Sequence, residues 1–237
     1  ITGNESVESA TLAPLVNLVV GDPLVLADLD AGLAAMVEHY NRLGFATVRV
    51  SPACDEIATG GASGQVPVVC EIEISEGVRT TIRSVAFDGN DAWGRDVLGA
   101  AIGAAVDAAY DGPEIDADRN AILELYLNDG YEQATVAVEP RFDDDLRAVD
   151  LIFRIREGPQ VLVDHILVVG NQRVKTETIR GELTLAPGSP LGLDDRAETQ
   201  RRLNALGMFR RLSIREFSHG REDRRDVVVY VEEAPAT

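Results

Sequence analysis

One strand-like segment occurs twice in the chain, with the same residues at both ends. Residues 75–90 read SEGVRTTIRSVAFDGN, and residues 156–171, 81 positions later, read REGPQVLVDHILVVGN. Each copy begins with Glu-Gly, continues as an alternating apolar run and ends with Gly-Asn. Thirteen positions separate the Glu from the closing Gly in both copies. This recurrence predicts a chain built from copies of one small structural unit.

Three landmarks recur in a fixed order along the chain: Gly-Asn, a glycine shortly before an aromatic residue, and Glu-Gly. They predict three tandem domains, residues 1–77, 78–158 and 159–237. The first domain lacks most of its opening strand, so we expect the chain to be a piece of a longer protein. The landmarks are Gly3-Asn4, Gly89-Asn90 and Gly170-Asn171; Gly44, Gly130 and Gly207; and Glu76, Glu157 and Glu233, the last followed by Ala.

Each unit shows the same order of periodicities: a strand, two helices and two more strands. An Asp, a good N-cap, lies at or near the start of each second helix, and the second-landmark glycine ends that helix. The closing strands alternate with period two. The predicted fold class is therefore α+β, with three tandem β-α-α-β-β domains, each a three-stranded mixed sheet with two helices on one face. The predicted helices cover residues 6–18, 28–43, 93–106, 116–128, 175–185 and 194–206.

Charge excludes one class of partner. The formal net charge is −18, which argues against nucleic acid because phosphate binding needs clustered cations. The third unit differs from the others, with 12 acidic and 12 basic residues, and it holds over half of the basic residues of the chain. No apolar run reaches the ~18 residues that a transmembrane helix needs.

The sequence shows no catalytic constellation. His39, His165 and His219 lie in no recognisable motif, so we expect surface or partly packed histidines rather than metal ligands. The acidic run 143–145 is expected to be a solvated turn. The sequence therefore predicts a protein that is not an enzyme and has no catalytic, cofactor-binding or metal site.

The ordered landmarks resemble those of the polypeptide-transport-associated (POTRA) domain. The most specific segment is PLGLDDRAETQRRLNALGMFRRLSI, residues 190–214, which is similar to the barrel-proximal POTRA of the BamA and TamA proteins. The resemblance implies the periplasmic portion of an outer-membrane protein, with the third repeat next to a C-terminal β-barrel. Three repeats favour the TamA type, and a longer parent protein would fit the BamA type equally well.

The resemblance also implies a function and partners. A member of this superfamily would be a periplasmic scaffold for outer-membrane protein assembly or translocation, binding unfolded outer-membrane proteins. Accessory periplasmic or inner-membrane-anchored proteins would be further partners. The alternatives are a structural spacer or oligomerisation module, and the POTRA region of a two-partner-secretion transporter.

In the POTRA family the penultimate strand of each unit lies at a sheet edge. The corresponding segments here are residues 45–54, 132–142 and 209–218. Exposed edge N–H and C=O groups can pair with another extended chain, which is β-augmentation. An edge that stays unpaired, or that packs on the neighbouring unit, is the alternative. The candidate client-binding residues are Val48, Val50, Ala134, Val136, Val138, Leu212 and Ile214.

Cys54 and Cys70 share one phase of two neighbouring predicted strands. If both phases face the helices, a disulfide can close this hairpin, and the oxidising compartment that the resemblance implies favours the bond. Two buried free cysteines are the alternative.

The arginines of the third unit form a candidate basic patch. Next to a membrane, the patch would contact the inner leaflet of the outer membrane, where acidic units would be repelled. Internal pairing with Asp194, Asp195 and Glu198 is the alternative. The patch comprises Arg201, Arg202, Arg210, Arg211 and Arg215.

Overall fold

The computed structural model describes residues 1–57 and 66–235. Its contacts divide the chain into two compact units, and the division passes through the middle repeat. The first unit comprises residues 1–86, 103–117 and 138–152; the second comprises residues 87–102, 118–137 and 153–237. No helix in the described part of the chain combines the length and apolar character needed to cross a membrane.

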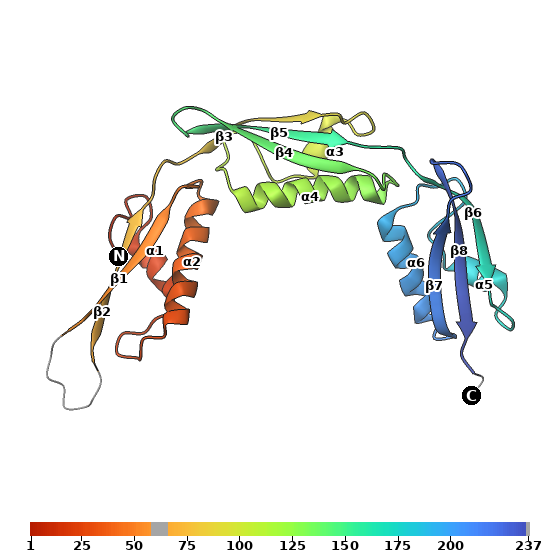
Figure 1. Cartoon of the computed structure of the whole chain (residues 1–237), viewed down its shortest axis with the longest axis horizontal. Helices are drawn as coiled ribbons and strands as arrows, with labels where there is room; N and C mark the ends of the chain where they lie inside the picture. Colours follow the sequence, from red (N-terminus) through yellow and green to blue (C-terminus); the bar gives the residue numbers. More distant parts are fainter. Residues whose placement is uncertain (58–65, 236–237) are drawn as a thin grey trace. The chain divides into compact units, whose positions relative to one another are not determined.

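The predicted order of elements recurs in each repeat (Figure 1). Each has a short first helix, a long second helix and a closing pair of strands. The first repeat contains α1 (Ser9–Leu12), the 3-10 helix η1 (Ala13–Val16), α2 (Leu26–Arg42), β1 (Arg49–Glu56) and β2 (Val68–Ser75). The second contains β3 (Thr81–Asp88), α3 (Arg95–Ala100), α4 (Gly112–Asn128), β4 (Thr135–Phe142) and β5 (Ala148–Arg156). The third contains β6 (Leu162–Val169), α5 (Thr176–Gly181), α6 (Leu193–Ala205), β7 (Phe209–Phe217) and β8 (Arg224–Glu233).

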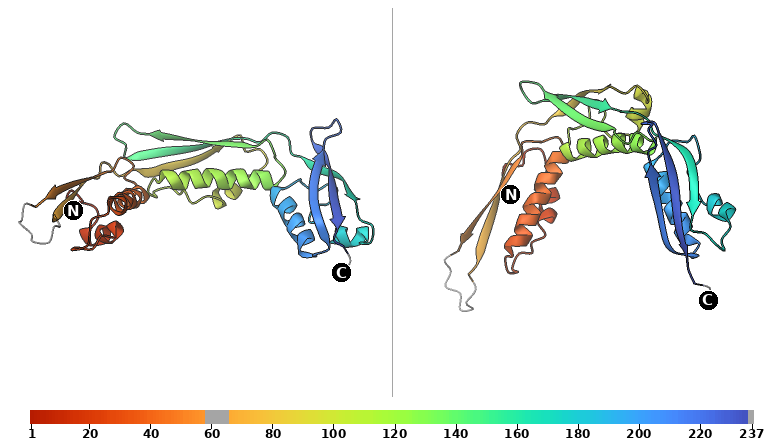
Figure 2. Two further views of the ribbon diagram at one scale, coloured as in Figure 1. Left: turned by 60° about the horizontal axis from the view of Figure 1, so that its bottom comes forward. Right: turned by 45° about the vertical axis from the view of Figure 1, so that its right-hand side comes forward.

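The sheets have the order β1-β2, β3-β5-β4 and β6-β8-β7. In the third, β6 runs parallel and β7 antiparallel to β8, which gives the predicted mixed sheet (Figure 2). As predicted, the first repeat lacks most of its opening strand; only Thr2 occupies that place, so the sheet has two strands instead of three. Thr2 forms a parallel bridge to Glu73 on β2, and its N–H donates to the Ile72 carbonyl at 2.9 Å.

The first helix of each repeat is much shorter than predicted, because the chain leaves it to make tertiary contacts. In the first repeat Asn17 adopts a left-handed conformation and ends η1. In the second, the chain beyond α3 pairs with β3, where the Ile82 N–H donates to the Ala108 carbonyl at 2.8 Å. In the third, the Thr184 N–H donates to the Thr199 hydroxyl of α6 at 3.1 Å.

The second helices begin differently from the prediction. The N-cap positions of α2 and α6 are Val25 and Gly192, and neither provides a side-chain cap. Asp28 and Asp194 lie instead in the first helical turn, where a carboxylate interacts favourably with the helix dipole.

Apolar side chains from the helices and from one face of each sheet form the cores. In the first repeat Leu33, Met36 and Tyr40 of α2 pack with Ile72 and Ile74 of β2. The third repeat has the same arrangement, with helices α5 and α6 on one face of the sheet. Its core contains Val163 and Ile166 of β6, Ile179 of α5, Leu203 of α6, and Val227, Val229 and Val231 of β8.

The Gly-Asn landmark is a turn that packs against the last strand of its own repeat. Gly89 has a φ of +81°, and a Cβ atom there would collide with the Ile155 carbonyl of β5. Gly3 and Gly170 occupy equivalent positions against Ile74 and Val231. The following Asn closes the turn with a side-chain hydrogen bond. The three bonds are Asn4 Nδ2 to Val7 O (2.7 Å), Asn90 Nδ2 to Trp93 O (2.8 Å) and Asn171 Nδ2 to Val174 O (2.9 Å).

The Glu-Gly landmark supplies the carboxylate that holds this turn. In the first repeat the Glu76 carboxylate accepts hydrogen bonds from the Ser6 N–H at 2.8 Å and the Tyr40 hydroxyl at 2.9 Å. In the second, Glu157 Oε1 accepts from the Ala92 N–H at 2.8 Å and the Tyr126 hydroxyl at 2.9 Å. The carboxylate therefore joins the last strand, the turn and the second helix of its repeat.

The third repeat holds the turn with more bonds from the backbone. Glu233 Oε1 accepts from the N–H groups of Gln172 (2.8 Å), Arg173 (2.7 Å) and Val174 (2.8 Å), and Oε2 contacts Arg173 Nε at 2.9 Å. These bonds, first that from Val174 and then that from the Arg173 guanidinium, lower the pKa of Glu233 to about 2. At the helix position that is Tyr40 or Tyr126 in the other repeats, this repeat has Leu203.

The glycine of the second landmark accepts a backbone hydrogen bond from the first residues of the next repeat. The N–H groups of Thr80 and Val161 donate to the carbonyls of Gly44 and Gly130, each at 2.8 Å. Both glycines have positive φ, and a Cβ atom would lie 2.6 Å from the Thr80 or Val161 carbonyl oxygen. At Gly207, nothing in the described part of the chain lies within 4 Å of the equivalent Cβ position.

We predict that Gly89→Ala destabilises the second repeat by at least about 2 kcal/mol, because alanine is strained at this φ and collides with a strand carbonyl. Urea unfolding followed by the fluorescence of Trp93, the single tryptophan, measures this repeat directly. Gly99→Ala in α3, where the Cβ meets open space, is the matched control. It should stabilise by up to about 1 kcal/mol. Equal stability of the two variants would show that the Gly89 turn is not a constraint.

We predict that Glu233→Gln removes an acid-sensitive part of the stability of the third repeat. The folded pKa of about 2 lies below the unfolded value of about 4.3, so the contribution is present above pH ~4.3 and is lost as the pH falls towards 2. The stability difference between wild type and variant should therefore shrink across this window in urea unfolding followed by circular dichroism. Exposed Glu222→Gln is the control. A difference that does not vary with pH would contradict the assignment.

Candidate functional site

The penultimate strand of each repeat lies at the edge of its sheet. β1, β4 and β7 each have a single strand neighbour. This is the edge position predicted from the sequence. Because an edge strand presents unpaired N–H and C=O groups, it can accept a further strand.

The opposite edges are partly occupied by the protein's own loops. On β3, the Ile82 N–H donates to Ala108, and on β6 the Val163 N–H donates to the Ser189 carbonyl at 2.9 Å. Within the described residues, no backbone hydrogen bond joins Phe209–Phe217 of β7 to anything other than β8. The third sheet therefore has one edge that a loop covers at residues 161–163, at the start of β6, and one open edge at β7.

The predicted client-binding side chains point largely towards the cores. Leu212 and Ile214 of β7 pack against the third core, and Val48 and Val50 pack against the first. Ala134 is buried, and Val136 and Val138 are half-buried. What the open edges offer to a partner is therefore mainly backbone.

Two of these residues lie outside the strands to which they were assigned. β1 begins at Arg49 and β4 at Thr135, so Val48 and Ala134 precede them. Both residues belong to turns, in which the Val48 N–H donates to Phe45 at 3.1 Å and the Ala134 N–H donates to Tyr131 at 3.0 Å.

A shallow hollow runs along β7 and β8 in the third repeat. The Arg215 guanidinium lies over the Tyr230 ring, 5.7 Å from its centroid. This hollow could accept side chains of a strand added next to β7. It is lined by Arg210, Arg211, Leu212, Ser213, Arg215, Tyr230, Val231 and Glu232.

The candidate basic patch is largely paired with carboxylates of its own repeat. Arg201 and Arg202 both pair with Glu198, and hydrogen bonding from Arg202 lowers the pKa of Glu198. Arg210 pairs with Glu232, and Arg211 Nε lies 3.8 Å from the same carboxylate. Contact of this patch with a membrane remains a prediction, and it would have to exchange these partners for lipid.

The structure brings together two histidines that sequence reasoning left separate. His165 and His219 are 54 positions apart, and both lie close to Asp164 and Asp226. No short sequence motif predicts this group, because its members come from two strands and a turn. The adjacent pair Asp164-His165, read with the pairing of β6 and β8, is the only signal that could have indicated it.

Cys54 and Cys70 are directly opposite each other in the β1–β2 register. A disulfide joins them across 16 positions of sequence. Cys70 also packs against the first core. The bond closes the long hairpin of the first repeat.

Small units with a mixed sheet, helices on one face and an open edge define a tandem-repeat α+β scaffold. The POTRA family model, described as "surface antigen variable number repeat", matches residues 80–158 and 161–234, more than half of the chain. The chain therefore belongs to the POTRA family, with tandem POTRA domains of the BamA superfamily. These domains are periplasmic portions of outer-membrane proteins, which places the chain in the periplasm.

Individual relatives agree with this assignment. A protein of Treponema pallidum, provisionally described as an outer membrane protein assembly factor, is 25% identical over 205 residues, 86% of this chain. The outer membrane protein assembly factor BamA of Neisseria meningitidis is 26% identical over 80 residues, 34% of this chain. The chain spans only 24% and 10% of the lengths of these relatives. The crystal structure of Haemophilus influenzae BamA POTRA3-5 has the same fold, with a TM-score of 0.54, 24% identity, and coverage of 98% of this chain and 93% of that one.

We predict that reduction of the Cys54–Cys70 bond lowers the melting temperature of the first repeat by roughly 12–24 °C. On the chain-entropy model, a bond closing a loop of this length contributes about 3 kcal/mol. Calorimetry with and without reductant, with thiol titration to verify reduction, measures the shift. A Cys54→Ala/Cys70→Ala double variant should not respond to reductant. An unchanged melting temperature in fully reduced wild type would contradict a stabilising role.

Proposed function

We propose that the chain is a periplasmic scaffold of an outer membrane protein assembly factor, and that it binds extended segments of unfolded outer-membrane proteins. The observation that carries the proposal is that the penultimate strand lies at an edge in all three sheets, and that in the third repeat this edge is open while the opposite one is occupied. The descriptions of the treponemal and neisserial relatives as assembly factors support the choice of client.

Pairing along an edge strand suits clients of different sequence. Main-chain hydrogen bonds give affinity with little dependence on the client's side chains, while neighbouring pockets add modest selectivity. On β7, the hollow beside Arg215 and Tyr230 provides such a pocket. Accessory periplasmic or inner-membrane-anchored proteins would bind the same edges through the same chemistry.

This function requires binding rather than catalysis. A scaffold of this kind orders an extended chain next to its own sheet and needs no cofactor. The curated relatives are described as assembly factors, which supports a role without enzymatic chemistry.

Site-specific photo-crosslinking tests the proposal. A photoreactive residue replaces Ser213 in β7 or, as a matched control, Leu162 in β6, which is also half-buried and lies where residues 188–190 cover the opposite edge of the same sheet. The probe is a peptide from an outer-membrane strand with alternating apolar residues. We expect a cross-link at position 213 at least about tenfold stronger than at position 162, because the sheet edge is open at position 213 and covered by a loop at position 162.

The peptide itself provides the second control. The same peptide with proline at alternate positions cannot donate the ladder hydrogen bonds, so it should not cross-link. A scrambled peptide with the same apolar alternation should cross-link nearly as well as the original. Equal labelling at both positions, an undiminished signal from the proline peptide, or no cross-link at all would overturn the proposal and favour a structural spacer.

A further inference from the structure

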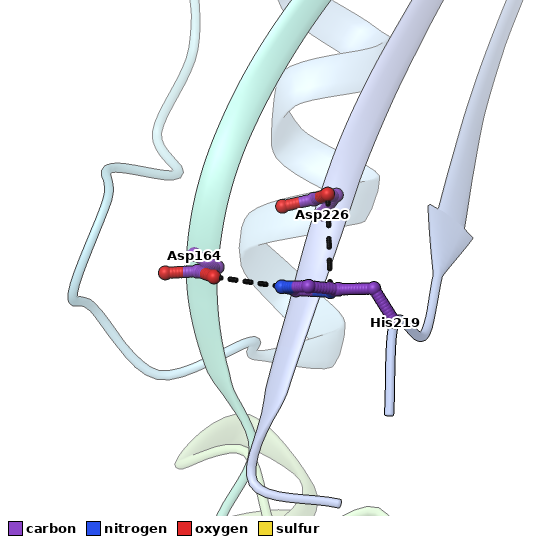
Figure 3. A group of neighbouring side chains, drawn as sticks. All are labelled: Asp164, His219 and Asp226. Atoms are coloured by element: carbon purple, nitrogen blue, oxygen red, sulfur yellow. Dashed lines mark hydrogen bonds and ion pairs between the residues drawn. The ribbon is translucent and has the colours of Figure 1, made fainter. Parts of the chain in front are cut away.

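A compact group of two carboxylates and two imidazoles lies at one end of the third sheet. Asp164 and His165 belong to β6, Asp226 belongs to β8, and His219 lies in the turn between β7 and β8. Figure 3 shows the His219 ring between the two aspartates. One ligand atom from each of Asp164, His219 and Asp226 can be chosen so that all three lie within 4.8 Å of one another.

A β-bulge positions the β6 members of this group. The register of β6 against β8 shifts between Val163 and Ile166, so that two residues, Asp164 and His165, lie opposite Asp226. Such a bulge re-aims side chains that regular alternation would send to opposite faces. Both side chains consequently reach the same place: His165 Nδ1 lies 3.5 Å from Asp164 Oδ2 and 3.0 Å from Asp226 Oδ1.

The separations match those of ligands around a tetrahedral zinc ion. Zinc bonds to imidazole nitrogen and carboxylate oxygen are about 2.0–2.2 Å long, which places neighbouring ligand atoms about 3.4 Å apart. His219 Nε2 lies 3.0 Å from Asp164 Oδ2, and His219 Nδ1 lies 3.9 Å from Asp226 Oδ2. One atom each of Asp164, His219 and Asp226 can be chosen within 4.8 Å of the others, so a small side-chain adjustment brings one His219 nitrogen and one oxygen of each aspartate to this spacing. His165 Nδ1 hydrogen-bonds Asp226 Oδ1 at 3.0 Å beside them.

Arg221 and Arg224 both lie near Asp164, and Arg224 pairs with the carboxylate oxygen that the histidines do not face. Arg224 Nη1 lies 3.4 Å from Asp164 Oδ1, whereas both histidines face the other oxygen, Oδ2. The two imidazole side chains are also partly exposed, with 69% of His165 and 42% of His219 accessible to solvent. An ion can therefore enter from solvent without moving the core.

We propose that Asp164, His219 and Asp226 bind a zinc ion that fastens the β7–β8 turn to the bulge in β6, with His165 hydrogen-bonded to Asp226 beside the site. The mixed nitrogen and oxygen set selects zinc over magnesium and calcium, which prefer oxygen ligands throughout. Because the turn ends the open edge strand β7, bound zinc would stabilise one end of that edge. This inference does not depend on the proposed function.

Isothermal titration of the untagged, chelator-treated chain with zinc chloride tests the site. Millimolar magnesium in the buffer suppresses non-specific binding to the acidic surface. We expect one zinc ion per chain, a rise in the melting temperature with zinc but not with calcium, and the visible spectrum of a tetrahedral site when cobalt(II) replaces zinc.

His219→Ala and His39→Ala are matched variants, since His39 belongs to α2 of the first repeat and is not a member of the group. His219→Ala should weaken zinc binding at least about tenfold and abolish the cobalt spectrum, because it removes one ligand. His39→Ala should bind as wild type does. Absence of stoichiometric binding by the wild type, or equal affinity of the wild type and His219→Ala, would overturn the proposal.

Discussion

The repeat depends on one carboxylate at the end of its last strand. Glu76, Glu157 and Glu233 each accept hydrogen bonds from the turn that follows the first strand of the same repeat. Some 60 to 70 residues of chain separate the two partners. The bond therefore links the end of each repeat to its beginning: it joins the last strand to the turn that precedes the helices. Each of these carboxylates is partly buried, and a carboxylate in such a site stabilises the fold most when it is fully hydrogen-bonded.

The third repeat reaches the same closure with different partners. Tyr40 and Tyr126 link the carboxylate to the second helix in the first two repeats, and burial together with the neighbouring glutamate raises the pKa of both tyrosines. In the third repeat Leu203 fills the helix position with apolar packing, and Arg173 supplies the additional donor. The turn therefore has the same geometry in all three repeats, whereas the side chains that hold it differ.

Strand order and loop placement together determine which backbone remains available. The last strand lies between the other two in the second and third sheets, so the penultimate strand is left at an edge. The loop after the first helix then occupies the opposite edge, through contacts such as Val163 with Ser189. The same unit therefore satisfies part of one sheet edge internally and leaves the other edge open, so the proposed binding function rests on the strand order rather than on particular side chains.

The sequence by itself determined the three repeats, the α+β class, and the common phase of Cys54 and Cys70. These features follow from local periodicity and turn residues, which depend only on neighbours along the chain. Only the tertiary structure decided the short first helices, the single bridge at Thr2, the pairing of the third-repeat arginines, and the meeting of His165 with His219. Each of these depends on contacts between distant segments: a bulge of one residue, or a loop that pairs with a strand, changes which side chains meet without leaving a periodic signal in the sequence.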